Sequence, residues 1–200
     1  MNAQERLYQR SREQNMPKLL NYLTTRRLEL FDGIGYIDTF FYEDTIIKDS
    51  IVLFTRDSLG NITQIETREL ATGKYDKVFH DSKSIPIYNV DKVLDAEAII
   101  ITEAIHDAES INQNMHIDGL VAISTNTASI KNNQLFLLYA ILKGKKKYIA
   151  YDNDRAGLEG SNKIQHLMPT ATLIDYPNDD LNKFLVKNKR IFRSHIEMQL

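Results

Sequence analysis

The chain has 200 residues, of which 42% are hydrophobic and 26% are charged, and its formal net charge is −2 at pH 7. These values describe an ordinary globular protein with one large or two small domains. The absence of cysteine excludes disulfides and any cysteine-ligated zinc. The small net charge excludes bulk attraction to nucleic acid, so any such binding requires local separation of charge.

The sequence indicates neither a membrane span nor a signal peptide. Its apolar runs, such as 98–101, are far shorter than the roughly 20 residues that span a bilayer. The N-terminal segment MNAQERLYQR has no apolar core and no small-residue cleavage site. We therefore expect a cytoplasmic protein with no membrane partner.

Residues 1–92 are predicted to form a small basic α+β domain. The apolar spacing predicts two short helices, at 3–14 and 17–28, in a segment where basic residues outnumber acidic ones. That excess fits a nucleic-acid contact and a solvated helix face about equally well. Gly33 to Gly35 predicts a turn, and β-branched runs predict strands at 45–47, 51–55 and 62–66, with a hairpin turn at 57–60.

Residues 93–200 are predicted to form a second domain, in which predicted strands and helices alternate. Short apolar runs that read as buried strands alternate with helical stretches; the strands are 98–102, 119–124, 148–151 and 171–174, and the helices are 105–115, 130–143 and 155–167. This alternation indicates right-handed βαβ units and a mostly parallel sheet. The expected fold is therefore Rossmann-like α/β over residues 93–190.

Acidic residues follow three of these predicted strands. Glu103 comes after the first, Asp152 and Asp154 after the third, and Asp180 beyond the fourth. Because ligands of open parallel sheets bind at the carboxyl ends of the strands, we expect these carboxylates to gather there. Their mutual repulsion calls for a cation, and hard oxygen ligands favour Mg²⁺ or Mn²⁺ in phosphoryl-transfer chemistry. The alternative for an Asp-x-Asp before a helix is an N-cap with a dipole-stabilising acid.

A lysine run at 143–147 has two interpretations as well. It includes Gly144 and follows a predicted helix, so it fits C-terminal capping, and it also fits a nucleic-acid patch.

The stretches Ile100–Ala108 and Ala150–Gly157 together resemble the Toprim domain, which is shared by DnaG-type primases, topoisomerases and some nucleases. The second stretch, Asp-Asn-Asp-Arg-Ala-Gly, is similar to the primase form. The resemblance implies that Glu103 is an acid/base group or metal ligand and that Asp152 and Asp154 bind a divalent metal. The chain departs from the family at Ala104, where a glycine is usual and an added methyl is expected to restrict φ.

Further segments resemble the catalytic core of DnaG-type primases in their order along the chain. They are 23–28 with 31–36, the hairpin 49–62, the segment 77–82, the loop 124–127 and the motif 180–185. In the last of these, Asn182 stands where many members have a second Asp, which weakens the expected second metal position. The resemblance implies that Arg56, Arg68, Lys77 and Asp107 are candidates for contacting template or nucleotide, and that Asp180 is a further metal ligand.

The activity implied by this resemblance is template-directed synthesis of short RNA primers on single-stranded DNA from NTPs, with Mg²⁺ or Mn²⁺. Because the chain has no cysteine, template reading is expected from a separate zinc-binding module, and a replicative helicase is an expected partner, as in a phage or mobile element. Two alternatives remain. The same carboxylates would serve a Toprim nuclease, and Ala104 and Asn182 leave open a non-catalytic nucleic-acid-binding replication adaptor.

Overall fold

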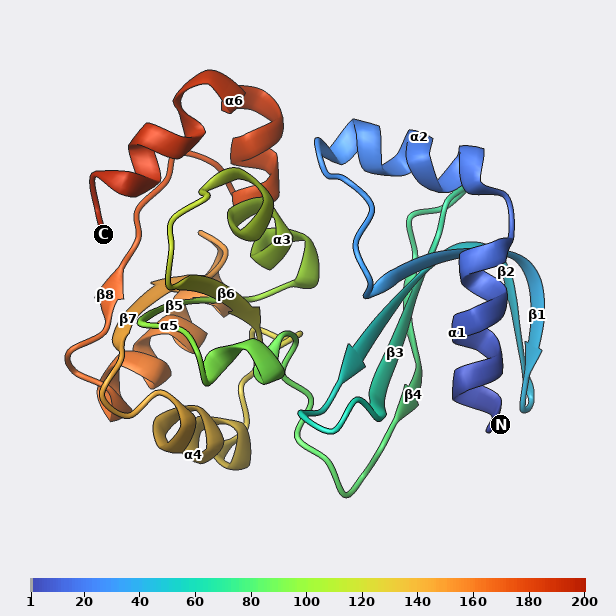
Figure 1. The fold of residues 1–200 in the computed structure, drawn as a ribbon, viewed down its shortest axis with the longest axis horizontal. Helices are drawn as coiled ribbons and strands as arrows, with labels where there is room; N and C mark the ends of the chain where they lie inside the picture. Colours follow the sequence, from blue (N-terminus) through green and yellow to red (C-terminus); the bar gives the residue numbers. More distant parts are fainter. Residues whose placement is uncertain (1) are drawn as a thin grey trace. The chain divides into compact units, whose positions relative to one another are not determined.

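Residues 2–200 are described in a computed structural model, which divides into two units (Figure 1). The N-terminal unit comprises residues 2–25 and 29–86, and the C-terminal unit comprises residues 26–28 and 87–200. Whether the predicted domains 1–92 and 93–200 fold independently stays a prediction. No helix within residues 2–200 is long and apolar enough to cross a membrane.

The N-terminal unit contains two helices and one antiparallel sheet with strand order β1-β2-β3-β4. Its elements are α1 (Ala3–Glu13), α2 (Met16–Arg26), β1 (Ile34–Tyr42), β2 (Thr45–Arg56), β3 (Ile62–Glu69) and β4 (Tyr75–His80). The predicted helix 17–28 stops at Arg26 because Arg27 has a positive φ of 53°, which a right-handed helix cannot contain.

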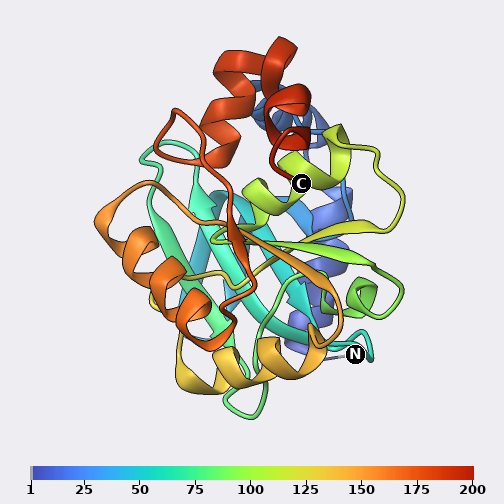
Figure 2. The same cartoon turned by 90° about the vertical axis from the view of Figure 1, so that its left-hand side faces the viewer.

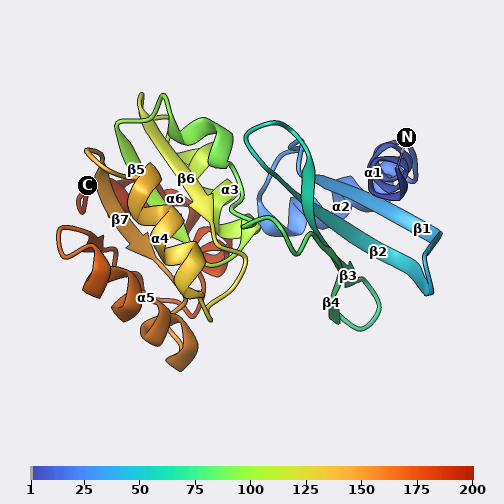
Figure 3. The same cartoon turned by 90° about the horizontal axis from the view of Figure 1, so that it is seen from below.

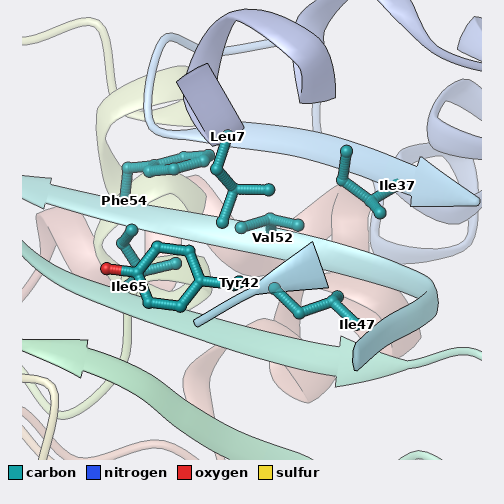
Figure 4. Packing of buried hydrophobic residues seen from close by; sticks show 7 residues of the cluster. All are labelled: Leu7, Ile37, Tyr42, Ile47, Val52, Phe54 and Ile65. Atoms are coloured by element: carbon teal, nitrogen blue, oxygen red, sulfur yellow. The ribbon is translucent and has the colours of Figure 1, made fainter. Parts of the chain in front are cut away.

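Helix α1 covers one face of this sheet and supplies its core. Leu7 of α1 is fully buried against side chains of β1, β2 and β3, as Figure 4 shows: Ile37, Tyr42, Ile47, Val52, Phe54 and Ile65. Burial of each such side chain contributes about 1.5–3 kcal/mol. Alternate residues of β2 therefore point toward α1, and the others point to the opposite face.

The predicted turn at Gly33 to Gly35 is confirmed only at its start: the chain turns at Asp32 and Gly33, and Gly35 already lies inside β1. A Cβ on Gly35 would sit 2.1 Å from Ser11 Oγ of α1, so the glycine permits the close approach of helix and strand rather than a turn. The runs 45–47 and 51–55, predicted as separate strands, are parts of β2. Strands β1 and β4 had not been predicted.

The C-terminal unit contains a four-stranded parallel sheet with strand order β6-β5-β7-β8. Its elements are the short 3₁₀ helix η1 (Val90–Val93), β5 (Ala98–Thr102), α3 (Ile105–Asn114), β6 (Leu120–Ser124), α4 (Asn132–Ile141), β7 (Lys146–Ala150), α5 (Arg155–Leu167), β8 (Thr172–Leu173) and α6 (Leu181–Glu197). Helices α3 and α6 lie on one face of the sheet, and α4 and α5 lie on the other (Figures 2 and 3). The expected fold class, a Rossmann-like α/β unit preceded by a small α+β unit, is confirmed. The description of the first domain as basic is wrong, because residues 1–92 contain 13 Lys and Arg against 14 Asp and Glu.

Candidate metal centre

The acidic residues meet at the carboxyl ends of neighbouring strands. Strands β5 and β7 are adjacent and parallel, with Thr102 aligned to Ala150. Glu103 directly follows the first of this pair, and Asp152 lies two residues beyond the second. Strand β8 flanks β7, and Asp180 lies farther along the same chain segment, at the start of α6. The strand order therefore delivers these carboxyl groups to one edge of the sheet.

Electrostatic coupling shows that the carboxyl groups lie close to one another. Burial, together with the charges of Asp107, Glu103, Asp180 and Asp154, raises the pKa of Asp152 to about 8. Burial, with repulsion from Asp180 and Glu103, raises the pKa of Asp107 to about 7. The pKa of Glu103 is raised by burial and by Asp154, and a hydrogen bond from the Asp152 backbone N–H opposes that rise. Such a cluster is destabilising while it lacks a positive charge.

Two oxygens in the cluster lack hydrogen-bond partners. Glu103 Oε2 and Asp152 Oδ1 are both buried and unpaired among the described residues. A buried polar atom without a partner costs free energy, and a divalent cation would satisfy both oxygens while removing the repulsion. The donor set, all carboxylate oxygen, fits Mg²⁺ or Mn²⁺.

The geometry limits how many side chains can bind such an ion at once. Within residues 2–200, no three acidic or histidine side chains form a group that could hold a metal ion as they stand. Mg²⁺ commonly uses only one or two protein carboxylates and completes its coordination with water and substrate phosphate oxygens. The residues therefore fit an ion held by Glu103 and Asp152, and they do not fit a cage formed by all four predicted ligands.

Asp154 and Asp180, the other predicted ligands, are helix N-caps. Asp154 Oδ1 accepts a hydrogen bond from Gly157 N at 2.8 Å and so caps α5. Asp180 Oδ1 accepts from Lys183 N at 2.6 Å and caps α6, while Lys183 Nζ lies 3.1 Å from Asp180 Oδ2. The capping interpretation of the Asp-x-Asp pair is confirmed for Asp154, Asp180 caps a helix as well, and each still contributes negative charge to the cluster.

The turn after β7 depends on a glycine. A Cβ on Gly157 would lie 2.1 Å from the carbonyl oxygen of Asp152, so only glycine lets α5 start this close to the strand end. Ala104, by contrast, has φ −122° and ψ 158°, an extended conformation open to any residue. The alanine at this position therefore imposes no backbone strain on the turn that follows Glu103.

Asn182 belongs to the scaffold of the C-terminal unit. Its side chain is buried, where Nδ2 donates to Arg26 O at 3.0 Å and Ser110 Oγ at 2.9 Å and Oδ1 accepts from Arg26 Nη1 at 3.1 Å. Its backbone N–H donates to Asp107 Oδ1 at 2.9 Å. Asp107, a candidate for contacting nucleotide or DNA, is itself buried. It acts on the centre through its charge.

Asn153, between the two aspartates, was not singled out from the sequence. Its Nδ2 donates to Tyr176 O at 2.6 Å and Asn178 O at 2.9 Å, and its backbone N–H donates to Asp179 O at 2.8 Å. Tyr176 is buried beside the cluster, and its hydroxyl donates to Tyr151 O at 2.7 Å. These bonds fasten the loop before Asp180 to the end of β7. No sequence signal identifies this role, because an asparagine in a turn ordinarily bonds to its own backbone.

The predicted basic contacts all lie in the N-terminal unit, on two faces of its sheet. Arg56 turns toward α1, where its guanidinium lies 4.4 Å from the Tyr8 ring centroid and 3.5 Å from Glu5 Oε1. Arg68 pairs with Tyr75 across β3 and β4, and Lys77 pairs with Glu66. Cross-strand alternation places Arg68 and Lys77 together on the face opposite α1. Arg56 therefore lies on the opposite face of the sheet from Arg68 and Lys77.

The same two units recur in known proteins. Residues 100–185 match the model of a Toprim-like family. Among solved structures, the Aquifex aeolicus primase with its zinc-binding and RNA polymerase domains is 18% identical, with a TM-score of 0.73 over 99% of this chain and 60% of that one. A DnaG primase catalytic domain bound to ssDNA is 16% identical (TM-score 0.69, 96% and 77% covered). The primase fragment of the bacteriophage T7 primase-helicase is 16% identical (TM-score 0.64, 90% and 69% covered). No curated protein matches the sequence significantly.

The C-terminal unit is therefore similar to a Toprim-like domain over residues 100–185, and its parallel strand order is consistent with that. The chain as a whole has the fold of a DnaG-type primase catalytic core. The resemblance seen in the sequence is confirmed at this level.

Proposed function

We propose that this chain is the catalytic part of a DNA primase that joins NTPs into short RNA primers on a single-stranded DNA template. The observation that carries the proposal is the pair of unpaired buried oxygens, Glu103 Oε2 and Asp152 Oδ1, at adjacent strand ends of a primase-core fold. Nucleotidyl transfer needs a divalent ion near the nucleotide phosphates, and these two atoms are placed to receive one.

The carboxyl groups of the cluster would have two different roles, metal binding and the supply of negative charge. Glu103 and Asp152 would hold Mg²⁺ or Mn²⁺, which when bound neutralises triphosphate charge and orients the attacking hydroxyl. Asp154 and Asp180 would add charge to the same edge while capping the helices that carry them.

Template and nucleotide phosphates would meet the basic face of β3 and β4. Arg68 suits a bidentate phosphate contact, and Lys77 suits a point-charge contact. Arg56 lies on the other face, toward α1, and is left out of this role. Related proteins indicate the partners: one relative is described as bound to ssDNA, one is part of a primase-helicase, and one carries a zinc-binding domain. We expect corresponding helicase and zinc-binding partners here.

The decisive experiment is to incubate the protein with single-stranded DNA, labelled NTPs and Mn²⁺, and to separate the products by size. Ribonucleotide oligomers that disappear with Asp152→Asn support the proposal. The matched control is Asp95→Asn, which removes an exposed carboxylate outside the cluster and should leave synthesis unchanged.

The other outcomes identify the alternatives. Shortened DNA, lost in Asp152→Asn, indicates a Toprim nuclease using the same carboxylates. No change in DNA or NTPs, with DNA binding retained, indicates the replication adaptor. The structure weakens the grounds for the adaptor, because Ala104 is unstrained and Asn182 has a full set of scaffold hydrogen bonds.

A further inference from the structure

Helix α4 is apolar nearly all round, yet part of it is exposed. Its sequence, NNQLFLLYAI, has no charged residue. Leu135 and Leu138 pack inward, whereas Phe136 is 65% exposed and Tyr139 is 50% exposed, one turn apart on the outer surface. An apolar helix is normally covered on every side, so this surface lacks a covering within the described part of the chain.

A groove runs between α4 and α5, which lie side by side on one face of the parallel sheet (Figure 3). Its volume is about 490 Å³, and its lining residues are Asn132, Leu135, Phe136, Asn162, Lys163, His166 and Leu167. The ten residues of α4 extend about 15 Å, which matches about three turns of a second helix laid alongside.

The rim of the groove is positively charged. Residues 121–151 contain no Asp or Glu, and their lysines are Lys131, Lys143, Lys145, Lys146 and Lys147. Lys145 is turned inward, since its Nζ donates to Leu94 O and Ala96 O. Lys131 and Lys143 remain exposed at the two ends of α4, and Lys163 is exposed on α5.

The apolar lining of the groove and the lysines around it indicate what kind of partner could bind there. We propose that this groove binds an acidic amphipathic helix of a partner protein, with apolar side chains between Phe136 and Leu167 and carboxylates against the lysines. Such recognition places apolar residues at i, i+3, i+4 and i+7 along a groove. Nucleic acid fits less well, because its phosphates require cations along the path of the backbone, and here the cations stand at the edges.

A second copy of this chain does not supply the occupant. Among the described helices, α1 and α6 expose mainly basic residues, and α2 and α4 contain no acid. In α3 the acids Asp107 and Glu109 are buried, and α5 has a single acid, Glu159, which pairs with Arg155. The proposal goes beyond priming and does not depend on it.

The test uses the full chain and synthetic peptides of about three helical turns. The probe carries Leu and Phe at i, i+3, i+4 and i+7 and Glu elsewhere. One control has the same composition in shuffled order, and a second has Lys in place of Glu. Fluorescence anisotropy should show the probe binding roughly tenfold or more tighter than either control. Equal binding of probe and shuffled peptide would overturn the proposal.

Two variants locate the binding. Phe136→Glu should weaken probe binding roughly tenfold or more, because it removes the groove's exposed aromatic and adds a repelling charge. Phe41→Glu makes the same change at a residue 73% exposed in the N-terminal unit and should leave binding unchanged. Thermal melts verify that both variants fold. Equal affinities of the two variants for the probe peptide would contradict the proposal. Binding of an oligo-dT probe that Phe136→Glu abolishes would also contradict it, and so would self-association of the chain that this variant abolishes.

Discussion

The loop that carries Asp180 is fastened by Asn153, and this contact yields the sharpest prediction. Asn153→Ala removes the side-chain hydrogen bonds to Tyr176 O and Asn178 O and leaves the backbone bond to Asp179 O in place. A net hydrogen bond contributes about 0.5–1.5 kcal/mol, and one of these two is solvent-exposed, so the expected loss is about 1–2 kcal/mol.

This loss shifts the docking of the loop on β7 by a factor of about 5–30. The variant would hold Asp180 less firmly beside the other carboxylates, so the cluster would attract a cation less strongly. The Mn²⁺ concentration for half-maximal thermal stabilisation should therefore rise by up to about tenfold. Asn153→Asp should have a larger effect, since it directs a carboxylate at two carbonyl oxygens and adds negative charge to the cluster.

The assay is a Mn²⁺ titration followed by thermal shift, repeated with primer synthesis as the readout. Asn21→Ala, which changes an exposed asparagine of α2, is the matched control and should behave as the unmodified protein. A shift in Tm without any shift in the Mn²⁺ midpoint would show that the loop is structural only. Unchanged Tm and midpoint would show that the backbone bond to Asp179 suffices.

Four further outcomes are expected. Because the folded-state pKa of Asp152 is raised to about 8, far above its unfolded value, the metal-free protein should lose stability as pH rises from about 4 to 8 in thermal melts, and Asp152→Asn should reduce that loss. Glu103→Gln should keep single-strand affinity in a filter-binding assay while abolishing product, and retained product would exclude a role for its charge. Arg68→Ala should weaken DNA binding and lower its salt dependence, whereas Arg56→Ala should lower Tm through loss of its contacts to α1 and leave DNA affinity unchanged; equal DNA affinities would contradict this division. Gly157→Ala should destabilise the fold by about 1–3 kcal/mol in chemical denaturation, because its Cβ would overlap the Asp152 carbonyl, and a neutral result would mean that α5 can shift freely.

The parallel sheet was predictable from the sequence because its strands are short apolar runs separated by helical periodicity. The segments 98–102 and 155–167 match β5 and α5 residue for residue. Helix α6 was not predicted, although Asp180 at its N-cap and apolar residues at 181, 184, 185, 192 and 196 mark an amphipathic helix. Its interior kink at Asn188 breaks the regular spacing of that pattern.

The acidic edge was predictable from the topology, because the carboxyl ends of all strands in a parallel sheet lie at the same edge, independently of the loop conformations. The basic face was not, because it depends on register. In the observed register, Leu53 lies opposite Glu66, which puts Arg56 and Arg68 on opposite faces. A slip of one residue would put them on the same face, and the register is set by the buried face of the strands and by the turn geometry, so the positions of the two arginines in the sequence do not reveal it.

The hydrogen bonds of Asn182 have a consequence for how this position can change over evolutionary time. The amide donates to the Arg26 carbonyl and to Ser110, so Asn182→Asp would place a carboxylate against a carbonyl oxygen inside the fold. We therefore expect an aspartate to be tolerated here only together with a change of the backbone near residue 26 or of the side chain at 110. The structure thus predicts that position 182 is coupled to residues 26 and 110, so that a change of this asparagine to aspartate would need a second substitution with it.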